Sequence, residues 1–299
     1  MTAGDVSSVA YLERLGARSA AVRSCLCLGI DPDPSAFPSA FSRDVAGVEA
    51  FAGLLVDAAG PYAAAVKVNL AFFEAFGSAG LAALERLRAR LPVDLPFIAD
   101  AKRGDIGSTA AKQAVALFDA LGADAVTVNP YLGSEAIAPL LERLDRFAYA
   151  LCRTSNPGAG ELQSLVVPAG DDAPAEPLYA RVARRAASWG PGGTVGLVVG
   201  ATAPSELATV RALAPGLAFL VPGLGAQGGD LASVLAEGPA TADPAGGRTG
   251  GGLLANVSRG IAAAAAGATD LVPAGASHDP GERVALAAEG WSRLLPVLP

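Results

Sequence analysis

Short apolar runs alternate along this chain with longer runs rich in alanine and leucine. The short runs have the length and composition of buried strands, and the longer ones repeat apolar residues at helical spacing. We expect strands at 24–30, 64–69, 97–101, 125–129, 147–153, 194–200, 218–221 and 253–256. We expect helices at 45–59, 81–90, 108–121, 134–144, 178–188, 204–213, 231–236 and 279–295.

This regular alternation predicts a parallel sheet with helical crossovers. Eight strands close a (β/α)8 TIM barrel, and 299 residues suit one such domain, 1–299. The stretch before residue 24 is expected to form an extra N-terminal helix that covers the bottom of the barrel. The alternative is an open, doubly wound sheet. Glycine and proline at 155–176 and 237–252 predict two long loops.

The composition favours a globular protein with a large core. Hydrophobic residues make up 52% of the chain and charged residues 17%, which disfavours disorder. The net charge is −7 and no basic stripe is visible, so nucleic acid is not an expected partner. The apolar runs are too short and interrupted for a membrane span, and no signal-peptide pattern is seen. We therefore expect a cytoplasmic protein.

The cysteines and the histidine narrow the possible chemistry. Cys25, Cys27 and Cys152 have no metal-ligand spacing, so we expect buried thiols in a reducing compartment. A reactive thiol is the alternative. The single histidine, His278, leaves no basis for a catalytic triad or a His-rich metal site, and none is expected. We expect His278 at the exposed start of a helix.

The strongest chemical signal is the motif D-x-K-x-x-D, formed by Asp100, Lys102 and Asp105 directly after an expected strand. Only two other lysines, Lys67 and Lys112, occur in a chain that otherwise uses arginine. Lysine can give up a proton, whereas arginine cannot readily do so. The motif therefore indicates proton transfer. Asp105 is expected to open the next helix, where a carboxylate also suits the helix dipole.

Polar residues gather where the expected strands end, which is the edge that carries active sites in TIM barrels. Lys67 lies inside an apolar strand, and a buried lysine is rare unless it is paired. Residues two apart on an extended chain share a face, so Asp100 and Lys102 point the same way. If the second and third strands are neighbours, these residues converge with Lys67. A purely structural ion pair is the alternative.

A second polar group follows the last two strands. The glycine-rich loop 222–229 contains Gln227, and Arg259 follows the eighth strand within the tripeptide 258–260. Glycines let backbone N–H groups approach an anion, and a guanidinium binds phosphate with two parallel hydrogen bonds. Barrels commonly bind phosphate at this place. We therefore expect a phosphate-bearing ligand.

Six segments in this order resemble the orotidine 5′-phosphate decarboxylase family, in particular its larger bacterial subgroup. They are L-G-I-D at 28–31, V-K-V-N at 66–69, D-A-K-R-G-D-I-G-S-T at 100–109, T-S-N-P-G-A at 154–159, P-G-L-G-A-Q-G-G at 222–229 and S-R-G-I at 258–261. D-x-K-x-x-D alone marks a wider superfamily. Together the six segments are highly specific and span about residues 25 to 265.

The resemblance implies a cofactor-free enzyme that converts orotidine 5′-phosphate to uridine 5′-phosphate, the last step of de novo pyrimidine synthesis. It implies that Lys102 protonates ring carbon six, with Asp100 beside the substrate carboxylate and Lys67 in the same charged array. It also implies that Asp105 reaches into the active site of a partner subunit, so that the sites of a homodimer are shared.

The resemblance further assigns residues that bind the substrate. Asp31 would hydrogen-bond the ribose, and Ser155 would bind the pyrimidine edge. Ile106 and Thr109 would accompany Asp105 into the partner's site. The phosphate would be held by Gln227 and Arg259.

Two other functions stay open. One is a metal-dependent sugar-phosphate decarboxylase of the same superfamily, for example one acting on 3-keto-gulonate 6-phosphate. The resemblance suggests that such an enzyme would carry a glutamate metal ligand ahead of the D-x-K motif, where this chain has Lys67. The other is a non-catalytic barrel that binds a phosphate ligand. Loss of Lys102 or Asp100 would mark it, and both are present.

Overall fold

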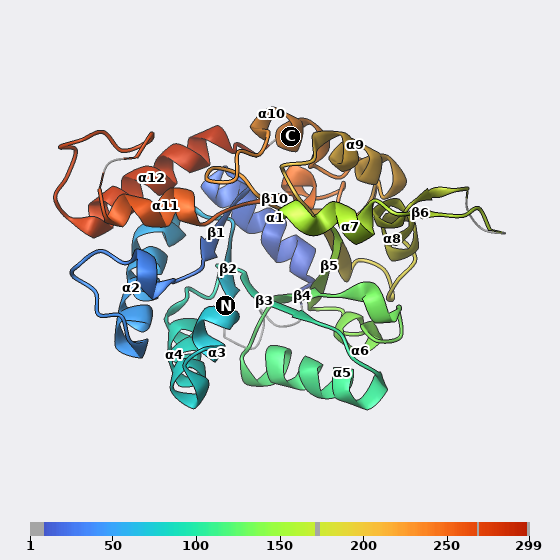
Figure 1. The fold of residues 1–299 in the computed structure, drawn as a ribbon, viewed down its shortest axis with the longest axis horizontal. Helices are drawn as coiled ribbons and strands as arrows, with labels where there is room; N and C mark the ends of the chain where they lie inside the picture. The colour runs from blue at the N-terminus through green and yellow to red at the C-terminus, as the bar shows by residue number, and fades with distance from the viewer. Residues whose placement is uncertain (1–8, 171–173, 268, 298–299) are drawn as a thin grey trace.

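The computed structural model describes residues 9–170, 174–267 and 269–297. In these ranges, eight parallel strands close a barrel (Figure 1). They are β1 (Leu26–Ile30), β2 (Ala65–Asn69), β3 (Phe97–Arg103), β4 (Ala125–Val128), β5 (Phe147–Arg153), β8 (Val195–Val199), β9 (Ala218–Pro222) and β10 (Leu254–Val257). The barrel closes where Leu26 of β1 pairs with Ala255 of β10. The TIM barrel is confirmed, and the open sheet is excluded.

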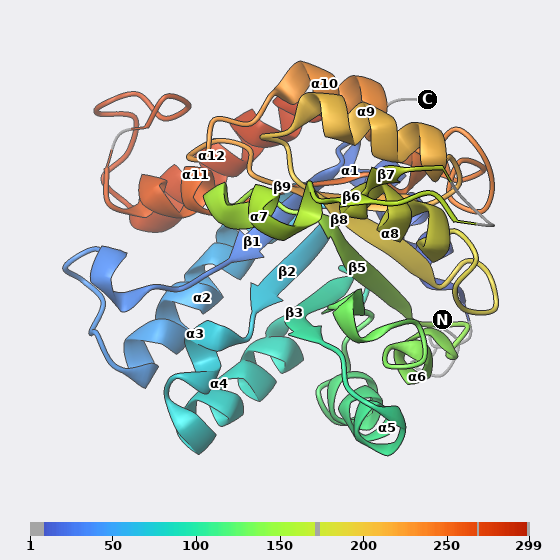
Figure 2. The same cartoon turned by 45° about the vertical axis from the view of Figure 1, so that its right-hand side comes forward.

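Helices surround the strands on the outside (Figure 2). The α-helices are α1 (Tyr11–Val22), α2 (Val45–Ala59), α3 (Ala71–Glu74), α4 (Gly77–Arg90), α5 (Gly107–Ala114), α6 (Ala138–Leu141), α7 (Gly160–Gln163), α8 (Leu178–Ala186), α9 (Pro204–Leu213), α10 (Leu231–Glu237), α11 (Arg259–Ala262) and α12 (Pro280–Leu294). A π-helix at Val115–Ala120 continues α5. Short 3-10 helices lie at Pro34–Ala36, Gly60–Tyr62, Pro130–Leu132, Pro157–Ala159, Thr249–Gly252 and Ala263–Ala265.

Three expected helices differ from those observed. The helix expected at 134–144 is reduced to α6, because Pro139 is tolerated only in the first turn of a helix. The helix expected at 108–121 changes from α to π at Val115. Helix α4 begins at Gly77, earlier than expected, and its first turn includes two glycines. One of them, Gly80, lies so close to the Phe73 carbonyl that a Cβ there would be 1.9 Å from its oxygen.

Helix α1 covers the end of the barrel where the strands begin, as expected. The Tyr11 ring stacks on Phe147 with ring centroids 4.9 Å apart. Its hydroxyl lies 3.2 Å from that of Tyr149, and both hydroxyls are buried. In Figure 1 this helix is visible behind the ring of strands. The bottom of the barrel is therefore closed by packed aromatic side chains, which leaves the opposite end for a ligand.

In their described residues, the two expected loops contain more regular structure than the sequence predicts. The first contains α7 and strand β6 (Val166–Val167), which pairs with β7 (Glu176–Pro177) in an antiparallel ribbon. The second is anchored by the buried Arg211, whose guanidinium donates to the carbonyl of Glu237 at 3.1 Å and to that of Leu217 at 2.8 Å. Such side chain to backbone bonds carry no signal in a single sequence.

The cysteines are buried free thiols, as expected. Burial raises the pKa of Cys25, Cys27 and Cys152 to about 12, which disfavours the reactive-thiol alternative. His278 is exposed just before α12, as expected. Among the described residues, no helix has the length and apolar character needed to cross a bilayer.

Candidate active site

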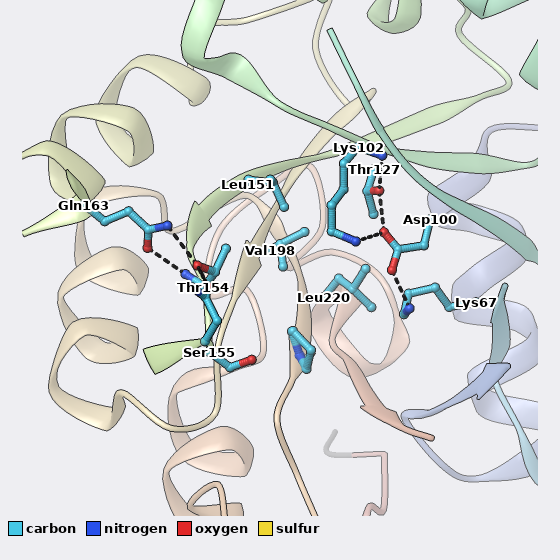
Figure 3. Close-up of a pocket in the computed structure, with 12 residues that line it drawn as sticks. Lys67, Asp100, Lys102, Thr127, Leu151, Thr154, Ser155, Gln163, Val198 and Leu220 are labelled. Atoms are coloured by element: carbon cyan, nitrogen blue, oxygen red, sulfur yellow. Dashed lines mark hydrogen bonds and ion pairs between the residues drawn. The ribbon is translucent and has the colours of Figure 1, made fainter. Parts of the chain in front are cut away.

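A cavity opens among the carboxyl ends of the strands, at the end of the barrel opposite α1 (Figure 3). Its larger compartment has a volume of about 450 Å³ and is lined by residues from β2, β3, β4, β5, β8 and β9. A second compartment of about 190 Å³ adjoins it. Lys67, Asp100 and Pro222 line both compartments, so the two belong to one site.

Three charged side chains meet between the compartments, as the sequence predicts. Strands β2 and β3 are neighbours, with Asn69 paired to Asp100. The Lys67 Nζ lies 2.6 Å from Asp100 Oδ2, and the Lys102 Nζ lies 2.6 Å from Asp100 Oδ1. Asp31 Oδ1 lies 4.0 Å from the Lys67 Nζ. Figure 3 shows both ammonium groups directed at the same carboxylate.

The pair formed by Lys67 and Asp100 is ionised although it is buried, with exposed fractions of 5% and 8%. Burial alone would raise the pKa of Asp100, but the charges of Lys67 and Lys102 outweigh it and hold this pKa well below its usual range. Burial would likewise lower the pKa of Lys67, but Asp100 and Asp31 raise it above its usual value. The site therefore keeps a fixed array of charges at neutral pH.

Lys102 reaches the cavity from a β-bulge, not from the regular extended chain that was expected. Ala99 pairs with Val126 and Arg103 with Val128, so residues 100–102 lie opposite Thr127 alone. The φ angle of Lys102 is 47°, in the left-handed region that side chains rarely adopt. Bulges re-aim side chains next to active sites. The predicted convergence and the neighbouring of the two strands are confirmed, but the regular extended chain expected at 100–102 is replaced by this bulge.

Thr127 is a site residue that the sequence reasoning missed. Its hydroxyl donates to Asp100 Oδ1 at 2.8 Å and accepts from the Lys102 backbone N–H at 2.9 Å. Within the apolar run 125–128 this threonine is indistinguishable from a β-branched strand former. The only feature of the sequence that could have indicated its role is its hydroxyl among otherwise apolar residues.

The far wall of the larger compartment combines polar and apolar groups. The Thr154 N–H donates to Gln163 Oε1 at 2.9 Å, and the Gln163 amide donates back to the Thr154 hydroxyl at 2.8 Å. These two hydrogen bonds fix Thr154. Ser155 follows it directly, and the Ser155 Oγ lies 3.5 Å from Gln227 Oε1. Leu151, Val198 and Leu220 complete the wall. Gln163 was missed because its segment was expected to be an irregular loop.

The smaller compartment contains the residues expected to bind an anion. Arg259 begins α11, and it lines this compartment together with Gln227, Asp31 and Asn256. Gly223 has a φ of 108°, which the turn toward Gln227 requires and which favours glycine. Asn256 is a third missed residue. It is 7% exposed, and its Oδ1 has no hydrogen-bond partner in the described residues.

The remaining expected site residues lie outside the cavity of their own chain. Asp105 accepts a hydrogen bond from the Ile106 N–H at 2.7 Å, and Ile106 rather than Asp105 caps α5. Ile106 is 67% exposed, and Thr109 is exposed as well. None of the three lines either compartment. These three residues therefore lie outside the cavity that Lys102 lines.

Comparisons with known proteins agree with this site. Residues 24–271 match the model of the orotidine 5′-phosphate decarboxylase / HUMPS family. The chain belongs to this family. Its matched region contains the barrel strands from β1 through β10 and both compartments of the cavity.

Individual family members match over most of their length. Over 259 residues the chain is 46% identical to the orotidine 5′-phosphate decarboxylase of Roseiflexus castenholzii, covering 86% of this chain and 90% of that protein. It is 42% identical to the same enzyme of Herpetosiphon aurantiacus, covering 87% and 91%. The structure of Leishmania donovani OMP decarboxylase superposes with a TM-score of 0.76 at 38% identity, covering 95% and 97% of the two chains.

Proposed function

We propose that this protein decarboxylates orotidine 5′-phosphate to uridine 5′-phosphate without a cofactor, with residues 1–299 acting as one domain. The observation that carries the proposal is the buried Asp100 carboxylate bonded to two ammonium groups at 2.6 Å, at the mouth of the barrel. A metal ion at Asp100 would have to compete with both ammonium charges. This favours direct proton chemistry over the metal-dependent sugar-phosphate reaction.

Lys102 is the proposed proton donor. Breaking the bond between ring carbon six and the carboxylate releases carbon dioxide and leaves an electron pair on that carbon. The ring cannot delocalise this pair, so a fixed positive charge must stabilise it. The Lys102 ammonium is half exposed to the cavity and tethered to Asp100, which suits that role. It would then transfer a proton to carbon six and become a neutral amine.

Asp100 would also act on the substrate carboxylate. Two negative charges about 4 Å apart repel by roughly 4 kcal/mol at an effective dielectric constant of about 20. Enzymes lower barriers by roughly 8–23 kcal/mol, so this repulsion supplies a minor part. Stabilisation of the carbanion by Lys102, within the array completed by Lys67, would supply more.

The cavity suits the rest of the nucleotide. The larger compartment, with Ser155 on its wall, would receive the pyrimidine. Asp31 would hydrogen-bond the ribose between the two compartments. Gln227 and Arg259 would hold the phosphate in the smaller compartment. Binding energy gained at the phosphate would then be used at the reacting carbon.

We also propose a homodimer with shared active sites. Asp105, Ile106 and Thr109 would enter the cavity of the partner subunit, which is consistent with their position outside their own. Two further exposed apolar residues follow β4, namely Tyr131 at 76% and Leu132 at 53%. Exposed apolar patches mark interaction surfaces. These residues and Ile106 would be covered by the second subunit.

A spectrophotometric assay tests the function. Purified protein should convert orotidine 5′-phosphate to uridine 5′-phosphate at the same rate with and without EDTA. Turnover that stops with EDTA and returns with a divalent cation would favour the metal-dependent alternative. Binding of the nucleotide without turnover would favour the non-catalytic barrel.

Arg259→Ala should weaken substrate binding strongly. Removing one partner of a desolvated charged pair costs about 2–5 kcal/mol, so KM should rise by more than about 30-fold. The measurement compares KM for the nucleotide and inhibition by the nucleoside, which lacks the phosphate. Arg293→Ala, which removes an exposed arginine from α12, is the control. If Arg259→Ala still prefers nucleotide to nucleoside as strongly as the wild type does, the phosphate lies elsewhere.

A further inference from the structure

We propose that Thr127 is a positioning residue, whose hydroxyl fixes the Lys102 backbone and the Asp100 carboxylate in one arrangement. This inference rests on the proposed role of Lys102 as proton donor. Thr127 lines the cavity but contributes no charge to it. It acts through the two residues that its hydroxyl joins.

The β-bulge leaves Thr127 as the one residue of β4 opposite this part of β3. Three residues of β3, 100 to 102, occupy the place opposite one residue of β4, and that residue is Thr127. A bulge interrupts the regular ladder of backbone hydrogen bonds. The Lys102 N–H instead donates to the Thr127 hydroxyl at 2.9 Å. A side chain thus supplies the acceptor that the neighbouring backbone does not.

The Thr127 hydroxyl uses both its donor and an acceptor in this arrangement. A hydroxyl has one hydrogen to donate and lone pairs to accept. The hydrogen of Thr127 goes to Asp100 Oδ1, and a lone pair receives the Lys102 N–H. Asp100 Oδ1 also accepts from the Lys102 ammonium. Backbone N–H, hydroxyl, carboxylate and ammonium therefore form a closed ring, visible in Figure 3.

This ring restricts the mobility of Lys102. Lys102 has a long, flexible side chain that is 50% exposed, and its backbone holds an unusual φ of 47°. Without the hydroxyl, the backbone of the bulge and the Asp100 carboxylate would each lose one hydrogen bond. The ammonium would still bond to Asp100, but both groups would be held less firmly beside the reacting carbon. A misplacement of about 1 Å can reduce a rate by roughly 100-fold.

Two substitutions separate the hydroxyl from the shape of the side chain. Thr127→Val keeps the volume and removes the hydroxyl, and Thr127→Ser keeps the hydroxyl. We expect kcat to fall by roughly 100-fold in Thr127→Val with KM changed less than about 3-fold, and to stay within about 5-fold in Thr127→Ser. Thr194→Val is the control, because Thr194 is 1% exposed and its hydroxyl has no partner in the described residues.

Each result decides the role of the hydroxyl. A Thr127→Val enzyme with wild-type kcat would overturn the proposal. Equal losses in Thr127→Ser and Thr127→Val would also overturn it, because packing rather than the hydroxyl would then matter. If Thr127→Val does not fold, Thr127→Cys is used, since a thiol is a weak donor and acceptor. Its kcat should lie well below that of Thr127→Ser, and equality of the two would overturn the proposal.

A measurement without substrate keeps this proposal separate from the proposed function. Amide hydrogen exchange at Lys102, followed by NMR, should be at least about tenfold faster in Thr127→Val and unchanged in Thr127→Ser, because a lost bond raises local opening. Unchanged exchange in Thr127→Val would refute the constraint on Lys102. If the wild type fails to decarboxylate orotidine 5′-phosphate, the proposed function fails, while the exchange data still test the constraint.

Discussion

Replacing Lys102 by alanine is expected to reduce turnover by at least about 10⁴-fold. The substitution removes both the charge that stabilises the carbanion and the acid that protonates it, and each contribution is typically worth about 10² or more. The measurement is kcat at saturating orotidine 5′-phosphate, together with product affinity by calorimetry as a check on the fold. Lys112→Ala, an exposed lysine on α5, is the matched control and should retain wild-type kcat.

Lys102→Arg should not restore activity. Guanidinium keeps the positive charge but is bulkier and a very poor acid. A folded Lys102→Ala enzyme with near wild-type turnover would remove Lys102 from the mechanism. Activity in Lys102→Arg but not in Lys102→Ala would show that charge alone matters and that the proton comes from another source.

Mixing two inactive variants, Asp105→Ala and Lys102→Ala, is expected to restore activity. If Asp105 serves the partner's site, the mixed dimer collects both lesions in one site and leaves the other site intact, by two-fold symmetry. Each mixed dimer should then reach about half of wild-type activity. The measurement is turnover after subunit exchange, with differently tagged chains to count mixed dimers.

The control for this experiment mixes Lys102→Ala with Asp100→Ala. Both of these residues line the same cavity of one chain, so every site in the mixed dimer carries a lesion and no activity should return. If mixed dimers of Asp105→Ala and Lys102→Ala form and stay inactive, Asp105 acts within its own subunit. The shared-site proposal would then be wrong.

The sequence predicted the barrel well because hydrophobic periodicity is a local property. The bounds of α2, α9 and β5 agree with the expected ranges, and all eight expected strands are present in the described residues. The errors have local causes that a periodicity pattern does not weigh. Pro139 shortens α6, because it is accepted only in the first turn of that helix. Gly80 lies within α4 because only a glycine allows this helix to approach the Phe73 carbonyl so closely.

The charged part of the site was also predictable, because parallel neighbouring strands bring their ends together. Lys67, Asp100 and Lys102 meet there, although Lys102 arrives from a β-bulge rather than by regular strand spacing. Thr127 and Gln163 were not predictable, since their roles depend on a bulge and on a short helix in an apparent loop. Whether Asp105 completes a partner's site depends on assembly, which spacing along one chain does not encode.

The bonding of Asp100 limits which side chains can replace it. One carboxylate oxygen accepts from Lys67 and the other from Lys102. An asparagine of the same shape offers one oxygen and one NH2 group, so whichever way it turns, it sets a donor against one ammonium. A neutral isostere is therefore more disruptive than the loss of one charge suggests. The site therefore requires an aspartate for two reasons: its negative charge, and its two equivalent oxygens, each of which accepts from one ammonium.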